Sequence, residues 1–296
     1  MDTSSSHPVV VGLDRSTQAF AALDHGAALA ERRHLPLLLV HAYEPSQFAV
    51  RSTIDWTPNT EGVLRNAAQR LVDDAVDVVS TFHPDVEVRS RLEPGSASEK
   101  LVEESERAHT VVVGSRGTRA LSDLLVGSTT LHVAAHASCP VVALPAPADD
   151  AALHRGVVVG VDGSVVSEDA IAYAFEAAAD LGEPLTAVHA WHDVTRTGTG
   201  RMMPLGYDTA EVLVEERLSL AESMAGWQEK FPDVEVHQLV VLGRPVSTLV
   251  HASNAARVLV VGCRGRGSVR SVLLGSVSHG LLVRATVPVA VVHGQH

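Results

Sequence analysis

The feature that most constrains this chain is an internal repeat with a single offset. When the sequence is shifted by 148 residues, half of its 296, Val11-Gly12-Leu13-Asp14 falls on Val159-Gly160-Val161-Asp162. Residues 84–88 fall on 232–236, and four further anchors obey the same offset without a gap. This period is too long for a solenoid, whose repeats are about 20–50 residues, so it indicates a duplicated domain. We expect domains at residues 1–146 and 147–296, joined at the Pro/Ala-rich segment near residues 145–150.

Each half alternates short apolar runs with longer helical stretches. The valine-rich runs lack polar alternation, which is typical of parallel strands covered by helices on both faces. In the first half the expected strands are residues 9–13, 37–41, 86–92, 110–113 and 139–144, and the expected helices are about 16–34, 60–81, 96–108 and 127–137. The predicted fold class is therefore α/β, with two tandem doubly wound domains, each a five-stranded parallel sheet flanked by helices. Ligands of such sheets bind at the carboxyl ends of the strands, near the point where the strand order reverses.

Charge and composition restrict the class of partner. The net charge of -12 disfavours nucleic acid and anionic lipid, so neither a nucleic acid nor a membrane is an expected partner. The N-terminal MDTSSSHP lacks an apolar core, and no apolar run is long enough to span a membrane, so we expect a cytoplasmic protein. Two cysteines do not form a disulfide framework; we expect Cys139 to be buried in a strand, whereas Cys263 lies in a glycine loop and could be exposed.

One glycine spacing occurs in both halves: a glycine, two residues, a glycine, nine residues, then Gly-Ser. The first glycine ends a strand, where a side chain would block a ligand over the sheet, and the second permits positive φ and close backbone approach. The Gly-Ser pair opens a helix, whose N–H groups and dipole attract anions. The pattern predicts a phosphate site in each half; alternatively, the glycines only form tight turns. The members are Gly114, Gly117, Gly127 and Ser128, and then Gly262, Gly265, Gly275 and Ser276.

This pattern resembles the ATP-binding class of the universal stress protein family, over nearly the whole chain and as two tandem domains. The resemblance implies ATP as the ligand, two per chain, with Mg²⁺ as a candidate accompanying ion. It implies that an aspartate after the first strand and a backbone group at the end of the second strand hold the ribose and adenine. These positions are Asp14 and Val40 in the first half, and Asp162 and Val188 in the second. The implied phosphate contacts continue into Thr129, Thr130, Val277 and Ser278.

The aspartates suit this role without the family as well. A carboxylate at the tip of the first strand can accept hydrogen bonds from ribose hydroxyls, as acidic residues do in other dinucleotide folds. The alternative is that Asp14 and Asp162 belong to helix caps, because Ser16 and Ser164 follow them closely.

Arginines and histidines supply the other polar candidates. Arg116 and Arg264 lie in the glycine loops of a chain with only two lysines, so they are candidate phosphate partners; solvated loop charges are the alternative. His41 and His189 follow the second strands, where we expect polar contacts at the carboxyl edge of the sheet.

The sequence favours binding over rapid turnover, because it lacks a P-loop, a G-x-S-x-G elbow and a committed metal spacing. The resemblance implies an ATP-binding regulator of stress or dormancy responses; the alternative is a slow ATPase or nucleotidyl-transfer enzyme. A third reading is a scaffold whose nucleotide is structural. We also expect a homodimer and a protein partner that the sequence does not name. Within one chain, the two halves should pair as a pseudo-twofold dimer through their last strands.

Overall fold

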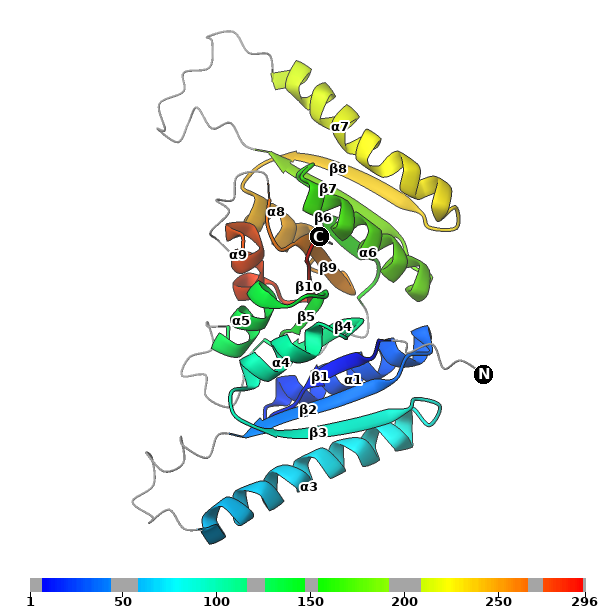
Figure 1. Ribbon diagram of the computed structural model, residues 1–296. Coiled ribbons are helices and arrows are strands. Elements are labelled where there is room, and N and C mark those ends of the chain that lie inside the picture. Colours follow the sequence, from blue (N-terminus) through cyan, green and yellow to red (C-terminus); the bar gives the residue numbers. More distant parts are fainter. Residues whose placement is uncertain are drawn as a thin grey trace, which may run out of the picture. The chain divides into compact units, whose positions relative to one another are not determined.

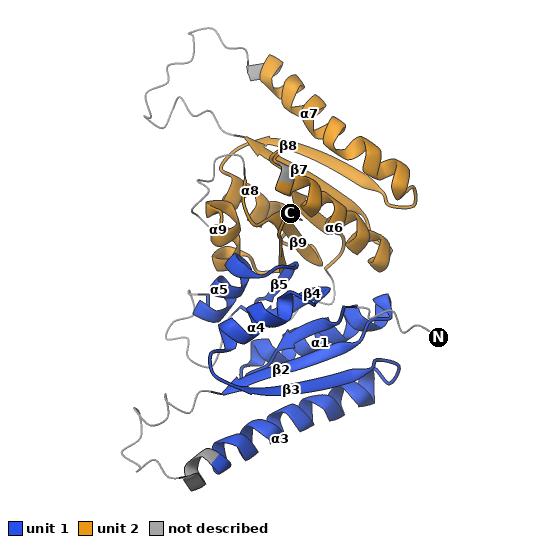
Figure 2. Cartoon of the chain, in the orientation of Figure 1, with its two compact units in different colours: residues 1–147 blue, residues 148–296 orange. Residues whose placement is uncertain are grey.

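The computed structural model describes residues 7–43, 58–115, 126–146, 154–191, 209–265 and 274–294. The chain divides into two compact units, residues 1–147 and 148–296 (Figure 2). Each unit has its own five strands, its own helices and its own core, and each is described below by itself. Among the described residues, no helix is both long and apolar enough to cross a membrane.

Unit 1 contains five parallel strands in the order β3-β2-β1-β4-β5 (Figure 1). The central strand is fully buried, because Val9, Val10 and Val11 have no exposed surface. Such a strand is covered on both faces, as the lack of polar alternation predicts. The strands are β1 (Val9–Gly12), β2 (Leu37–Tyr43), β3 (Val88–Pro94), β4 (Thr110–Gly114) and β5 (Val141–Leu144).

Two pairs of helices cover the sheet of unit 1. The first pair, α1 (Thr17–Arg33) and α3 (Pro58–Phe82), contact each other, as do α4 (Ala97–Ser105) and α5 (Ser128–His136). Ser16 begins α1 by capping it, and His34 ends it in the left-handed conformation with φ 53°. Small residues bring α1 close to the sheet: a side chain on Gly26 would overlap Val11.

Unit 2 repeats this arrangement, with five parallel strands in the order β8-β7-β6-β9-β10. Its first helix is capped by Ser164 and ends at Gly182, which has φ 63°. The strands are β6 (Val157–Gly160), β7 (Leu185–Trp191), β8 (Val236–Leu242), β9 (Val258–Gly262) and β10 (Val289–Val292). The helices are α6 (Val165–Leu181), α7 (Thr209–Lys230), α8 (Pro245–Ala252) and α9 (Ser276–Arg284). The predicted fold class, two tandem α/β domains with parallel sheets, is confirmed.

Candidate functional site

The ends of two neighbouring strands frame the site in each unit. In unit 1, β1 pairs in parallel with β2 on one side and with β4 on the other. The chain moves outward from β1 to β2 and β3 and then crosses to β4, so the strand order reverses between β1 and β4. In unit 2 the same reversal lies between β6 and β9. Ligands of doubly wound sheets bind at such switch points.

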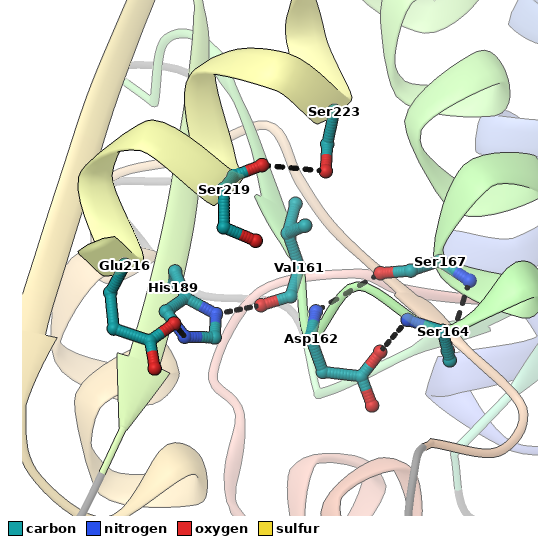
Figure 3. A network of polar contacts seen from close by, with 8 residues as sticks. All are labelled: Val161, Asp162, Ser164, Ser167, His189, Glu216, Ser219 and Ser223. Carbon is teal, nitrogen blue, oxygen red and sulfur yellow. Dashed lines mark hydrogen bonds and ion pairs between the residues drawn. The ribbon is translucent and has the colours of Figure 1, made fainter.

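A carboxylate follows the first strand of each unit and is held by the turn before the next helix. Oδ1 of Asp14 accepts hydrogen bonds from the backbone N–H (2.8 Å) and the hydroxyl of Ser16. Oδ1 of Asp162 accepts one from the backbone N–H of Ser164 at 2.9 Å (Figure 3). The helix caps are the serines, whose side chains accept from N–H groups of the first turn. The aspartates therefore orient the turn and keep a carboxylate at the strand tip.

Packing is the first reason for the glycines that end β4 and β9. A Cβ on Gly114 would lie 2.7 Å from Cβ of Gln18 and 2.9 Å from the carbonyl carbon of that residue. A Cβ on Gly262 would lie 2.9 Å from Cγ1 of Val166. Both neighbours belong to the first turn of α1 or α6. We expected a bound ligand to require these glycines, but the first turns of α1 and α6 already require them.

The second glycine of the motif is described in unit 2 only, since Arg116 and Gly117 lie outside the described residues. Gly265 is not among the described glycines with positive φ, so the conformational reason given for it from sequence is wrong. The reason is close approach instead, because a methyl group on Gly265 would overlap Oδ2 of Asp162. The glycine loop thus passes directly against the carboxylate at the tip of β6. Arg264 lies half-buried beside it.

A backbone hydrogen bond ties the start of the last helix to the strand before it. The N–H of Gly127 donates to the carbonyl of Ser115 at 2.8 Å, and the N–H of Gly275 donates to the carbonyl of Cys263 at 2.7 Å. Both ends of each glycine loop are therefore fixed. Cys263 is buried, with 1% of its surface exposed, so the exposed position considered for it is wrong. Cys139 is buried, as expected, but it precedes β5 and does not lie in the strand.

Two hydroxyls strengthen this closure. Oγ1 of Thr130 donates to the carbonyl of Gly114 at 2.7 Å, and Oγ of Ser278 donates to the carbonyl of Gly262 at 2.6 Å. Both side chains are buried. The expectation that these residues contact phosphate does not hold for their hydroxyls, which stabilise the protein framework.

The helix starts leave backbone donors open. The N-caps are Gly127 and Gly275, which have no side chain to cap the helix, and neither first turn carries an acidic residue. N–H groups in the first turn have no acceptor within a helix. Those of Ser128 and Thr129, and of Ser276 and Val277, therefore lie at the positive end of a helix dipole beside the strand ends, an arrangement that favours anions.

Val40 and Val188 occupy a different place from the one expected. Each strand that contains them continues for three more residues, so they do not end the second strand. The carbonyl of Val40 accepts from the N–H of Leu13 at 2.8 Å, and that of Val188 from the N–H of Val161 at 2.9 Å. Their backbones therefore fasten the tip of the first strand.

The histidines that follow these valines bind the same tips. Nδ1 of His41 donates to the carbonyl of Leu13 at 2.8 Å, and Nδ1 of His189 donates to the carbonyl of Val161 at 2.7 Å. The expected polar contact at the carboxyl edge is found in both units. Among the described residues, no group of three His, Cys, Asp or Glu side chains could hold a metal ion.

Glu216 is a site residue that the sequence analysis missed. Its Oε2 lies 3.0 Å from Nε2 of His189, so one imidazole joins α7 to the tip of β6 (Figure 3). The signal was a glutamate on the buried stripe of α7, where Val212, Glu216, Leu220 and Met224 follow one another at intervals of four. The equivalent residue of unit 1 is Ala68, whose side chain cannot form this bridge.

The two units can now be compared with known proteins. The model of the universal stress protein family matches residues 6–145 and again 154–293. The chain belongs to the universal stress protein family. It is 40% identical to universal stress protein Rv2005c of Mycobacterium tuberculosis over 96% of both chains, and 37% identical to universal stress protein Rv2623 of that species over 97% of both.

A solved structure gives the same fold for the whole tandem. The universal stress protein from Archaeoglobus fulgidus DSM 4304 aligns with a TM-score of 0.70 at 21% identity, covering 98% of this chain and 97% of that one. Because the identity is low, this likeness supports only the fold, that is, the arrangement of strands and helices. The two universal stress protein domains of this chain therefore have the architecture of their family.

Proposed function

We propose that each universal stress protein domain binds one ATP at the carboxyl ends of its central strands. Nucleotide occupancy would set how the chain acts on a partner in a stress or dormancy response. One observation carries the proposal: in both units an aspartate at the tip of the first strand lies at the same edge as an uncapped helix start. Membership of the universal stress protein family supports the proposed role in a stress or dormancy response.

The polar groups on the two sides of this sheet edge complement the polar groups of a nucleotide. The N–H groups at the starts of α5 and α9 offer donors to phosphate oxygens, and the carboxylates of Asp14 and Asp162 offer acceptors to ribose hydroxyls. Arg116 and Arg264 would add positive charge in a chain whose net charge is -12. Inorganic phosphate would use only the donors, so the acceptor favours a sugar phosphate. Any Mg²⁺ would come with the triphosphate.

The adenine contact needs a revised assignment. Since the carbonyls of Val40 and Val188 already accept a hydrogen bond within the sheet, an adenine amino group would have to use their second lone pair. We retain both residues as candidates on that basis. Thr130 and Ser278 contribute to phosphate binding, in this proposal, only through their backbone N–H groups.

Calorimetric titration of the nucleotide-free chain with ATP tests the proposal, and we expect close to two sites per chain. Asp14→Ala and Asp162→Ala should each weaken one site about tenfold, because a charged acceptor to the ribose is lost. Asp24→Ala is the control, since Asp24 is an exposed aspartate of α1. Absence of binding, or unchanged affinity in both site variants, would overturn the proposal. Phosphate release in the same samples measures any ATPase activity.

A further inference from the structure

One position carries an aromatic residue in both halves of the chain. The sequence has 3 tyrosines, 3 tryptophans and 5 phenylalanines, and the shift by half of its length superposes a single pair of them, Tyr43 and Trp191. Tyr43 is the last residue of β2, and Trp191 is the last residue of β7. Each unit therefore has an aromatic side chain at the carboxyl end of its second strand.

The polar atom of Trp191 has no partner in the folded chain. Among the described residues, the indole Nε1 of Trp191 is the only buried side-chain nitrogen or oxygen without a hydrogen bond. A buried N–H that has lost water and gained no acceptor destabilises the folded state. Such groups are uncommon in native proteins, so a ligand that brings an acceptor would account for this one.

Strand register places Trp191 at the edge of the sheet that carries the proposed ATP site. Gly160 of β6 pairs with Val188 of β7, and the N–H of Val161 also donates to the carbonyl of Val188. Asp162 follows Val161, and Trp191 lies three residues beyond Val188, so both stand at the carboxyl ends of neighbouring strands. The backbones of neighbouring strands are about 4.8 Å apart, which is less than the length of a nucleoside.

The strand order decides which end of a nucleotide meets β7. β6 lies between β7 and β9, Asp162 follows β6, and the open helix start of α9 follows β9. In the proposed site the phosphates lie at α9 and the ribose at Asp162. Because the base and the phosphates are attached at opposite ends of the ribose, the base then lies on the other side of β6, over the end of β7.

We propose, on the basis of the ATP site proposed above, that the indole Nε1 of Trp191 donates a hydrogen bond to a ring nitrogen of the adenine bound in unit 2. The amino group of adenine is the part of the base assigned above to the carbonyl of Val188. N1 and N7 are the two acceptors that flank this amino group, so one of them is the partner of the indole. Trp191 is thereby a residue that selects the base.

Regular structure on the described side of Trp191 holds this donor in place. Its carbonyl accepts from the N–H of Gly243 at 2.8 Å, and its backbone pairs with Leu242 of β8. His189, two residues earlier and on the same face of β7, is fixed by the carbonyl of Val161 and by Glu216 (Figure 3). A donor that is already ordered loses little conformational freedom when a ligand binds.

The two units differ in the chemistry of this position. An indole N–H can only donate, whereas the phenol of Tyr43 can donate or accept. The contact proposed for unit 2 therefore requires an acceptor on the base, and a substitution of Trp191 should alter one of the two ATP sites of the chain.

Indole N–H signals in NMR spectra of the chain labelled with ¹⁵N-tryptophan test the contact directly. The chain has 3 tryptophans, so Trp→Phe variants at each position assign the three signals. Saturation of the nucleotide-free wild type with ATP should move the proton signal of Trp191 downfield, because a new hydrogen bond forms. An unmoved Trp191 signal in a chain that binds two ATP would overturn this contact alone. A wild type that binds no ATP would overturn the proposed function and the contact with it.

Calorimetric titration with altered bases gives a second measurement. Trp191→Phe keeps a ring but removes the donor, and it should weaken one ATP site about fivefold. Trp227→Phe is the matched control, because Trp227 of α7 packs against Phe175 and Phe231, and it should leave both sites unchanged.

Titration of the same chains with 1-deaza-ATP and 7-deaza-ATP identifies the acceptor, since each analogue lacks one of the two ring nitrogens. The wild type and Trp191→Phe should bind one of these analogues equally well, because the indole then has no partner to lose. A loss that persists with both analogues would contradict the contact with the base and would indicate a ribose or phosphate oxygen instead.

Discussion

At Gly265 the glycine loop of unit 2 lies so close to Asp162 that an added Cβ would overlap the carboxylate oxygen Oδ2. Gly265→Ala should push Asp162 out of place and weaken ATP binding at the proposed site of unit 2 by about 1 kcal/mol, roughly fivefold in affinity. The site of unit 1 should keep its affinity. Calorimetric titration that resolves the two sites measures this.

Gly226→Ala provides the control for that substitution. Gly226 lies in α7, where an added Cβ would meet nothing within 4 Å. Alanine there should leave both sites unchanged and slightly stabilise the helix. If Gly265→Ala also left both affinities unchanged, the loop and the aspartate would not belong to one site.

Single residues also show the limit of reading a site from sequence. The glycines and Asp14 could be assigned to a site from the sequence, because each belongs to a motif formed by residues close together in the chain. The bond from Thr130 to the carbonyl of Gly114 could not, since it joins residues sixteen apart that only the closed loop brings together. The contact between Gly265 and Asp162 likewise depends on the fold.

At the scale of elements, α7 is joined to the tip of β6 through His189 and Glu216. Glu216→Ala introduces the residue of unit 1 and should destabilise the docking of α7 by about 1 kcal/mol, because a half-buried hydrogen bond is lost. Hydrogen exchange should become faster in α7 and remain unchanged in α3.

The neighbouring Glu215→Ala is the matched control, because Glu215 is exposed on the same helix. It should leave exchange in α7 as in the wild type. Equal exchange rates in the Glu215 and Glu216 variants would mean that the contact with His189 does not hold the helix.

Strand cores were predicted better than strand ends. The apolar runs place all five strands of unit 1, yet β2 reaches Tyr43, two residues beyond the expected end. Pairing sets that limit, since Tyr43 lies opposite Pro94 of β3. The family resemblance implied that Val40 lies at the end of this strand, but the extension places it at the middle. The length of an apolar run in the sequence indicates how many residues of a strand are buried. Where the strand ends depends instead on pairing with a neighbouring strand that is distant in sequence.

For the whole molecule, His25 couples stability to pH. Burial within unit 1, assisted by the charge of Arg32, lowers the pKa of His25 to about 4 from 6.5. The unfolded chain therefore binds the proton more readily than the folded one between these values. Stability contributed by neutral His25 is complete above pH 6.5 and is lost as the pH falls toward 4.

We expect the free energy of unfolding to fall by roughly 1–3 kcal/mol over this window through His25. His25→Gln should reduce the fall, and the exposed His279→Gln should leave it unchanged. Urea unfolding at pH 7, 5.5 and 4.5 provides the measurement. An identical pH profile for His25→Gln and the wild type would exclude this residue as the cause.

The duplication was the most reliable whole-chain prediction, because an ungapped offset depends on no propensity. The proposed pairing of the two halves through their last strands stays a prediction, to be tested by self-association of residues 1–148 expressed alone. Sequence could not reveal how far the halves have diverged at one edge, since Leu239 and Arg91 are unremarkable until both strands are known to lie at sheet edges.

The ion pair between Arg91 and Glu104 finally bears on how large an assembly of this chain can grow. Two adhesive edges on one molecule would allow each copy to recruit another without end, and the product would be a fibre. Charge on β3 works against this, because a strand that approached it would have to bury or displace Arg91 and Glu104. Arg91→Leu with Glu104→Ala would remove that charge and should make the chain more prone to form fibres.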